Sequence, residues 1–235
     1  MTPYKPTLTE RVVDTTLKGI TTLLCRVDGK QLSQIPAQGP LIVVTNHINF
    51  LEAPVIYTRL QPRPITGFAK IETWDSAFLG WLFDVWGMIP IRRGEADMTA
   101  IKKGLAALKN GQILAIAPEG TRSNDGRLLR GQPGVVTMAL LSGAPILPLV
   151  HYGHENYRKE LPRLRRSQLH AIVGRTFWLE NCGEKVTGEV RQQMTDEIMY
   201  QLAMLLPPEY RGAYSDLSKA TQKYLRFASP SMNNN

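Results

Sequence analysis

The stretch LIVVTNHINFLE, residues 41–52, decides the fold. Its first half, LIVVTN, is rich in β-branched residues and predicts a buried strand of a parallel sheet. His47 follows at the end of this strand, at a point where a helix can begin. A second apolar run, QILAIAP at 112–118, leads into the polar turn PEGTRS at 118–123. Turns at the carboxyl ends of parallel strands are where α/β proteins tend to bind ligands.

Signals for strands and helices alternate over most of the chain. We expect further strands in PITGFAK (64–70), at 146–150 and in HAIVG (170–174), and helices at 8–26, 99–110, 134–142 and 189–206. This order predicts an α/β domain with a largely parallel central sheet flanked by helices. We divide the chain into an N-terminal amphipathic helix (1–27), a domain (28–227) and a disordered tail (228–235).

The composition favours an anionic partner, because 28 Lys and Arg residues outnumber 20 Asp and Glu residues. Two distant cysteines, Cys25 and Cys182, indicate neither a disulfide framework nor a metal ribbon, and they fit a reducing compartment. We see no secretory signal at the N-terminus. The uncharged stretch 131–150 is long enough to span a bilayer. Its prolines and glycines indicate a short buried helix, a turn and a strand instead.

A histidine and a carboxylate, His47 and Glu52, lie five residues apart. If a helix starts just after His47, the Glu52 carboxylate can turn back to the imidazole and fix its tautomer. The other ring nitrogen is then free to take a proton from a substrate hydroxyl. The alternative is that His47 caps a helix and Glu52 is a solvated charge, and the pair alone does not exclude it.

The turn after the second strand offers groups suited to phosphate: backbone at Gly120, hydroxyls at Thr121 and Ser123, and the planar fork of Arg122. Two more arginines, Arg92 and Arg93, follow the apolar run GMIPI at 87–91. Taken alone, each group also fits an ordinary solvated turn.

Four blocks occur in a fixed order: NH-x-x-x-x-E (46–52), G-x-I-P-x-x-R (87–93), PEGTRS (118–123) and AP-x-x-P (144–148). Here the chain resembles the glycerolipid acyltransferases, which include bacterial 1-acyl-glycerol-3-phosphate acyltransferase, over roughly residues 28–180. The resemblance implies transfer of a fatty acyl group from a thioester to 1-acyl-glycerol-3-phosphate, giving phosphatidic acid. It implies no metal and no cofactor, with acyl-CoA or acyl-acyl carrier protein as the co-substrate.

The resemblance also implies a role for each matching position. His47 is the expected general base, and Glu52 stands where the family normally has an aspartate as the carboxylate partner. The expected acceptor-binding residues are Arg92, Arg93, Glu119, Gly120, Thr121 and Arg122. Pro145 is expected to shape the acyl site. Gln132 stands where a basic residue commonly precedes the next helix, and Arg130 is a nearby substitute.

Because the acceptor and the product are lipids, we expect peripheral or monotopic attachment to the cytoplasmic side of the cell membrane. Candidate surfaces are the helix 8–26, the aromatic-rich segment 74–88 and five basic residues: Arg158, Lys159, Arg163, Arg165 and Arg166. Both apolar segments fit a protein core equally well.

Other interpretations stay open. The acceptor can be glycerol 3-phosphate or another lysophospholipid, and the Glu52 replacement leaves room for a non-catalytic lipid-binding homologue. Acyl carrier protein is a candidate partner. Nucleic acid is not expected, because no nucleic-acid-binding module is recognisable. We interpret His151 and His154 as incidental to the site, although their spacing could suit a metal ion.

Overall fold

The computed structural model describes residues 4–92, 94 and 97–227. The strands in these ranges are β1 (Cys25–Asp28), β2 (Leu41–Thr45), β3 (Ile65–Lys70), β4 (Ile89–Ile91), β5 (Ile113–Ile116), β6 (Ile146–Tyr152), β7 (Ser167–Val173), β8 (Phe177–Leu179) and β9 (Leu225–Phe227). They form one sheet in the order β1-β7-β6-β2-β5-β3-β4, with β8 beside β6 and β9 beside β8. The predicted tail, 228–235, lies outside the described residues.

The helices are α1 (Leu8–Leu24), α2 (Glu52–Leu60), α3 (Ala77–Val85), α4 (Met98–Lys109), α5 (Gly134–Ser142), α6 (Tyr157–Glu160) and α7 (Gly188–Leu205). Short 3-10 turns lie at Lys30–Gln34, Ile71–Asp75, Leu161–Arg163, Pro208–Tyr210, Gly212–Tyr214 and Leu217–Lys219. The helix predicted at 134–142 is confirmed, and those predicted at 99–110 and 189–206 match α4 and α7 within one residue.

The sheet is parallel where the site lies. β2 pairs in parallel with both β5 and β6, and β3 pairs in parallel with β4 and β5. β7, β8 and β9 extend the sheet through antiparallel pairs, whereas β1 lies parallel to β7. The predicted class, an α/β fold with a largely parallel sheet flanked by helices, is confirmed.

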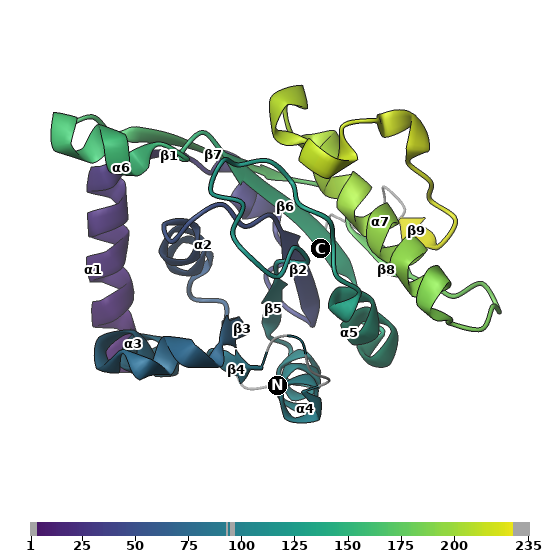
Figure 1. The fold of residues 1–235 in the computed structure, drawn as a ribbon. Helices are drawn as coiled ribbons and strands as arrows, with labels where there is room; N and C mark the ends of the chain where they lie inside the picture. Colours follow the sequence, from purple (N-terminus) through teal and green to yellow (C-terminus); the bar gives the residue numbers. More distant parts are fainter. Residues whose placement is uncertain (1–3, 93, 95–96, 228–235) are drawn as a thin grey trace.

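Two hydrophobic cores lie on opposite faces of the sheet. Side chains alternate along β2, so that Ile42 and Val44 belong to one core and Leu41 and Val43 to the other. Helices α4, α5 and α7 cover the first face, and α2 and α3 cover the second (Figure 1). Both faces of β2 are therefore sealed, which accounts for its continuous apolar sequence.

Helix α1 differs from the predicted helix 8–26 in its end and in its faces. It starts at a capping box between Thr7 and Glu10 and ends at Leu24, because Cys25 begins β1 and pairs with β7. The apolar residues of this predicted amphipathic helix do not share one buried face. Val13 and Leu17 pack against the core, whereas Val12 and Ile20 are exposed.

The inward face of α1 is held by polar contacts. The indole Nε1 of Trp86 donates to Asp14 Oδ1 at 3.1 Å, and the guanidinium of Arg59 donates to Thr21 Oγ1 at 3.1 Å. These contacts fix α1 against α2 and the end of α3. The apolar residues on the opposite face of α1, Val12 and Ile20 among them, are exposed in the described part of the chain.

The uncharged stretch 131–150 forms a helix and a strand, as predicted. Helix α5 ends at Gly143, whose φ of 62° is the left-handed conformation that glycine adopts readily at helix ends. Strand β6 follows at Ile146. Within the described ranges, none of the helices combines the length and the apolar character that crossing a bilayer requires.

Candidate active site

The carboxyl ends of three neighbouring strands carry the site. β6, β2 and β5 are adjacent and parallel, so the segments that follow them meet at one edge of the sheet. The segment after β2 contains His47 and leads into α2, and the segment after β5 contains PEGTRS. Backbone N–H groups of Ser123 and Asn124 donate to the carbonyls of His47 and Ile48 at 2.8 and 3.1 Å. The first and third blocks of the sequence thus form one surface.

His47 and Glu52 are in contact. Glu52 is the first residue of α2, and its Oε1 contacts His47 Nδ1. The carboxylate also accepts backbone N–H groups of Ile48 and Asn49, at 3.1 and 2.9 Å. The His47 side chain is 22% exposed, whereas that of Glu52 is 5% exposed. A substrate can therefore reach the imidazole of His47, whereas the Glu52 carboxylate behind it is largely shielded from solvent.

Glu52 is held in its charged form. Burial acts to raise its pKa, but the nearby His151, His154 and His47 outweigh burial and hold the pKa well below the usual range. An ionised carboxylate on Nδ1 fixes the imidazole tautomer and stabilises the imidazolium that forms when Nε2 takes a proton. The pair therefore has the geometry of a general base with its orienting group.

Glu119 lies behind the site instead of facing a ligand. It is buried, and its Oε1 accepts the backbone N–H of His47 at 2.7 Å while its Oε2 accepts that of Leu129 at 2.8 Å. Burial raises the pKa of Glu119 to about 7, because it opposes the charge more strongly than these two donors favour it. This position differs from the expected contact with glycerol phosphate, since both oxygens are occupied by backbone groups.

A cavity of about 950 Å³ opens beside His47. Its polar lining includes His47, Glu52, Lys70, Glu72, Asp97, Gly120, Thr121, Arg122, Asn124, Gln132 and Arg191. Its apolar lining includes Phe50, Ile56, Phe68, Phe83, Met88, Ile91, Ile101, Ile116, Val135 and Met138. A ligand with a charged head and a long apolar tail matches such a mixture.

The structure brings some of the predicted binding residues to the cavity and not others. Gly120, Thr121 and Arg122 line it, and the Arg122 guanidinium lies 5.8 Å from the ring centre of Phe50. Arg92 is exposed and is not among the lining residues, although its neighbour Ile91 is. Arg93 lies outside the described residues.

Pro145 and Arg130 are not brought to the cavity either. Pro145 precedes β6, at the amino end of the strand, and its carbonyl accepts the N–H of Ile42 at 2.9 Å. The site lies at the opposite end of β6, so this position does not fit the expected role in the acyl site. Arg130 is exposed and is not a lining residue, whereas Gln132 lines the cavity.

Two cations of the cavity were not predicted. Lys70 ends β3, and Arg191 comes from α7. A signal for Lys70 was available, since it is a charged residue at the carboxyl end of an apolar strand, the same edge of the sheet at which His47 lies. Arg191 carried no such signal, because only tertiary packing brings α7 to the rim of the cavity.

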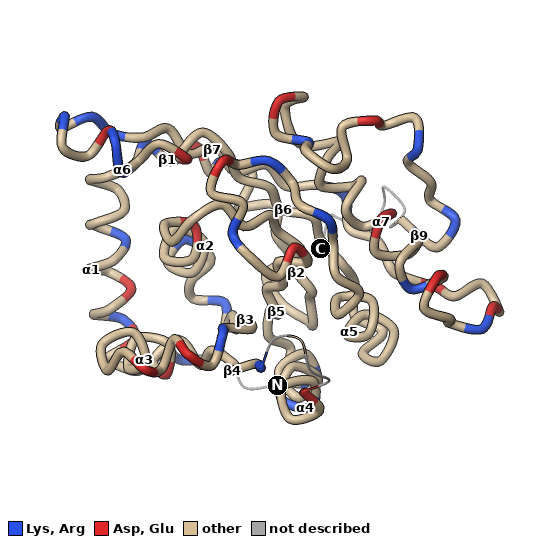
Figure 2. Tube along the Cα trace, viewed as in Figure 1, with Lys and Arg blue, Asp and Glu red and all other residues tan. Residues whose placement is uncertain are grey.

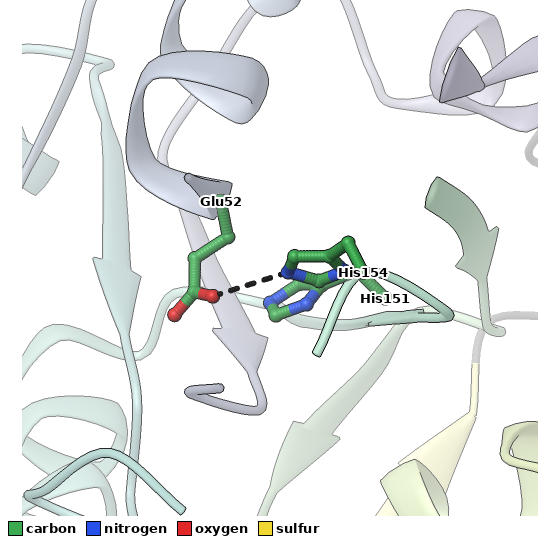
Figure 3. Close-up of side chains that lie close together, drawn as sticks. All are labelled: Glu52, His151 and His154. Carbon is green, nitrogen blue, oxygen red and sulfur yellow. Dashed lines mark ion pairs between the residues drawn. The ribbon is translucent and has the colours of Figure 1, made fainter. Parts of the chain in front are cut away.

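His151 and His154, which we interpreted as incidental, lie beside the site. Both are buried, and His154 Nε2 lies 3.5 Å from Glu52 Oε2 (Figure 3). Their position at the carboxyl end of β6, next to β2, brings them to Glu52. The signal that could have found them was two histidines at the carboxyl end of an apolar strand, one within it and one two residues beyond.

Comparison with known proteins gives a consistent result. A family model described as acyltransferase matches residues 26–152. The chloroplast 1-acyl-sn-glycerol-3-phosphate acyltransferase BAT2 of Brassica napus is 30% identical over 132 residues, which are 54% of this chain and 38% of the relative. The 1-acyl-sn-glycerol-3-phosphate acyltransferase of Bacillus subtilis is 26% identical over 189 residues, which are 80% of this chain and 92% of the relative.

A solved structure shares the fold. The crystal structure of the 1-acyl-sn-glycerophosphate acyltransferase PlsC from Thermotoga maritima has a TM-score of 0.59 and 20% sequence identity, covering 83% of this chain and 79% of that one. The chain spans less than two fifths of the length of the chloroplast relative. The matching family model covers more than half of the chain, including both His47 and PEGTRS. The chain belongs to the acyltransferase family.

Proposed function

We propose that the protein transfers a fatty acyl group from a thioester to the free hydroxyl of 1-acyl-glycerol-3-phosphate, giving phosphatidic acid. The observation that carries this proposal is the His47–Glu52 contact at a cavity that is lined by both charged and apolar side chains, Arg122 among the charged ones. The named activities of the Brassica napus and Bacillus subtilis relatives support the same acceptor.

The chemistry needs no enzyme nucleophile. His47 Nε2 removes the proton from the acceptor hydroxyl as its oxygen attacks the thioester carbonyl carbon. Glu52, on Nδ1, stabilises the resulting imidazolium. The carbon–sulfur bond then breaks, and the departing thiolate takes the proton from the imidazolium. Atoms and charge balance, and His47 returns to its starting state.

The acceptor phosphate is assigned to Arg122, with Lys70, whose Nζ also pairs with Glu72 Oε1 at 3.2 Å, as a second cation. Arg122 lies in the turn after β5, the strand next to β2, and it lines the cavity. Its planar guanidinium suits bidentate contact with phosphate oxygens. Gly120 has a φ of 68°, a conformation that favours glycine and lets the turn approach a ligand closely. Anchoring the phosphate here presents the hydroxyl to His47 in an attacking orientation.

The acyl chains are assigned to the apolar part of the cavity, between β3, β5, α4 and α5. Phe68, Ile101, Ile116 and Met138 come from these four elements and line it. No cofactor enters this scheme, and the donor is acyl-CoA or acyl-acyl carrier protein. Arg191, at the rim, is suited to the anionic part of either carrier.

The first experiment is an assay of the purified protein with acyl-CoA and acyl-acyl carrier protein, each with 1-acyl-glycerol-3-phosphate, glycerol 3-phosphate and other lysophospholipids. Formation of phosphatidic acid, lost in His47→Ala, supports the acceptor and the base together. Transfer to another acceptor alone would show that 1-acyl-glycerol-3-phosphate is the wrong acceptor, while acyl transfer itself would stand. Binding of lysophospholipid without transfer from either donor would favour a non-catalytic lipid-binding homologue.

We further propose peripheral attachment to the cytoplasmic side of a membrane through one surface, which we call the α1 surface. It consists of the exposed apolar residues Leu8, Val12, Ile20, Leu23, Phe78, Trp81, Leu161 and Leu164 with the basic residues Arg158, Lys159, Arg163, Arg165 and Arg166. Leu23, Leu164 and Phe78 are 74%, 95% and 66% exposed. A patch of this kind suits a lipid interface.

Contacts hold the parts of the α1 surface together. Arg166 donates to the carbonyl of Cys25 at 2.9 Å, which places the basic segment at the end of α1. Trp86, just after α3, donates to Asp14 in the middle of α1. Figure 2 shows Lys and Arg gathered around α6, beside the end of α1. Apolar side chains flanked by cations match an anionic leaflet.

A further inference from the structure

Two buried histidines, His151 and His154, lie behind Glu52. His151 is 1% exposed and His154 is 0% exposed. In the described part of the chain, His151 Nδ1 and both ring nitrogens of His154 lack a hydrogen-bond partner. An apolar side chain of similar shape would avoid the cost of burying these atoms. Their presence therefore calls for a functional explanation.

The two oxygens of Glu52 face two different histidines. Oε1 contacts His47 Nδ1, and Oε2 lies 3.5 Å from His154 Nε2. The second separation is at the outer limit of a hydrogen bond, and such contacts commonly shorten when substrate binds. Figure 3 shows the His154 ring directed at the Glu52 carboxylate, with the His151 ring beside it. Glu52 is thus placed between the accessible His47 and the inaccessible His154.

The backbone that carries His154 is fixed to the segment that carries His47. Asn46 exchanges two hydrogen bonds with the backbone of His151, at 2.9 and 3.0 Å, and its carbonyl faces His151 Nε2 at 2.8 Å. Asn49 Nδ2 donates to the carbonyl of His154 at 3.2 Å. His154 is therefore held at a fixed position relative to Glu52.

His151 has one available protonation state near neutral pH. Its Nε2 must carry a proton in order to donate to the Asn46 carbonyl, and burial lowers the pKa of His151 to about 4. It is consequently neutral, with an unprotonated Nδ1. Its ring lies 5.2 Å from that of His154, centre to centre, and packs beside it.

We propose that His154 is a positioning residue: its Nε2–H donates to Glu52 Oε2 and keeps Oε1 on His47. This inference rests on the proposed function of His47 as the general base. Backbone donors of Ile48 and Asn49 hold the carboxylate from the side of the loop, and His154 closes the opposite side. Glutamate has one more rotatable bond than aspartate, so its carboxylate gains more from this second anchor.

The same three side chains, Glu52, His151 and His154, also have the composition of a metal site, with donor atoms within 4.8 Å of one another. The hydrogen bonds argue against this use. The carboxylate already accepts two backbone N–H groups and contacts His47, so a cation would compete with His47 for it. His151 Nε2 is also committed to Asn46.

The test compares His154→Leu with His154→Gln. Leucine removes the donor, whereas the glutamine amide places an N–H near the position of Nε2. We expect kcat to fall on the order of 10- to 100-fold in His154→Leu, with unchanged KM for donor and acceptor, and to recover largely in His154→Gln. The Tm of His154→Leu should not fall, since leucine leaves no unsatisfied polar atom. His170→Gln, at a half-exposed histidine outside the site, is the matched control.

A double-mutant cycle with Glu52→Asp tests whether His154 acts through Glu52. Removing His154 in the Glu52→Asp background should cost much less than in the wild type, because the shorter carboxylate no longer spans both histidines. Additive effects would overturn the inference. Wild-type kcat in His154→Leu, or a loss of kcat that tracks a fall in Tm, would overturn it as well.

A measurement that does not depend on turnover separates this inference from the proposed function. In a long-range ¹H–¹⁵N spectrum of the histidine side chains, Glu52→Gln should shift the His154 signals and leave those of His170 unchanged. If the wild type transfers acyl groups to no acceptor, the proposed function fails while this contact is still tested. Unshifted His154 signals, or stoichiometric zinc in the purified protein, would overturn it.

Discussion

The backbone N–H of His47 donates to Glu119 Oε1 at 2.7 Å, across 72 residues of sequence. Glu119 belongs to the turn that carries Arg122, and its second oxygen accepts the N–H of Leu129, so one buried carboxylate ties the His47 backbone to that turn and to Leu129. The glutamate of PEGTRS thus links the proposed base to the turn that carries Arg122, the proposed phosphate ligand. It does so without facing the cavity.

Glu119→Gln should lower both the stability of the protein and its rate of acyl transfer. One oxygen of Glu119 becomes an amide NH₂ that faces a backbone N–H, which leaves a buried donor unpaired and costs roughly 1–3 kcal/mol. We expect a lower free energy of unfolding in urea and a lower kcat. Glu180→Gln, at an exposed ion pair with Arg226, is the control and should change the free energy of unfolding little. Equal stability of the two variants would contradict the clamping role of Glu119.

The stability difference between the wild type and Glu119→Gln should depend on pH. The folded protein keeps a proton on Glu119 up to about pH 7, whereas the unfolded chain releases it near its ordinary value of 4.5. Between these values the folded state binds more protons, so the contribution of Glu119 to stability is largest below pH 4.5 and falls as pH rises toward 7. Urea titrations of both proteins at several pH values should show the gap narrowing over this window. A gap that widens would contradict the raised pKa.

The elements that could be predicted from sequence are those whose signals are local. Helix α5, the turn at Gly143 and strand β6 follow from apolar runs punctuated by glycine and proline. The His47–Glu52 contact could be anticipated from the spacing of the two residues, although the loop before α2 brings them together and not a helical turn, because α2 begins only at Glu52. Strand β1 could not, since its four residues are too short to show a pattern.

Contacts between distant segments could not be predicted. His154 reaches Glu52 because β6 pairs with β2, and a single sequence does not state which strands are neighbours. Glu119 was recognised as part of PEGTRS, but a motif does not tell whether a side chain faces a ligand or the backbone behind it. The same holds for Pro145, which lies at the end of β6 remote from the site.

Glu52→Asp should lower kcat. The structure places the Glu52 carboxylate on His47 and on two backbone N–H groups, and shortening the side chain withdraws it by about 1.5 Å, one carbon–carbon bond. We expect a loss on the order of 10- to 100-fold in kcat with little change in KM. Steady-state kinetics with saturating donor measure this. A variant faster than the wild type would mean that the natural chain is catalytically impaired.

Arg122→Lys should weaken acceptor binding selectively. Lysine keeps the positive charge but loses the planar fork that contacts two phosphate oxygens, so we expect KM for 1-acyl-glycerol-3-phosphate to rise roughly tenfold. KM for the donor should not change. Arg127→Lys is a suitable control, because Arg127 is exposed and does not line the cavity. Equal KM values for the acceptor in Arg122→Lys and the wild type would show that Arg122 does not bind the acceptor phosphate.

Ile101→Phe should change the preference for acyl-chain length. Ile101 lines the apolar part of the cavity from α4, and a larger side chain there reduces the space for methylene groups. We expect kcat/KM to fall more for long-chain donors than for short ones, with the short donor as the internal control. Pro145→Ala should leave the ratio unchanged, because Pro145 does not line the cavity. An equal loss for all donors would exclude this part of the cavity as the acyl site.

The double variant Leu23→Gln/Leu164→Gln should release the protein from anionic vesicles. Both leucines lie on the α1 surface, and burial of each side chain in the lipid interface contributes about 1.5–3 kcal/mol to binding. The partition coefficient of the double variant between vesicles and water should therefore be at least tenfold lower than that of the wild type. Leu141→Gln is the matched control, because Leu141 is 61% exposed on α5, away from α1 (Figure 1). Flotation with phosphatidylglycerol-containing vesicles measures the effect. Neutral vesicles should bind the wild type more weakly, since each basic residue near an anionic surface contributes about 1 kcal/mol. Wild-type flotation by the double variant would assign membrane binding to another surface.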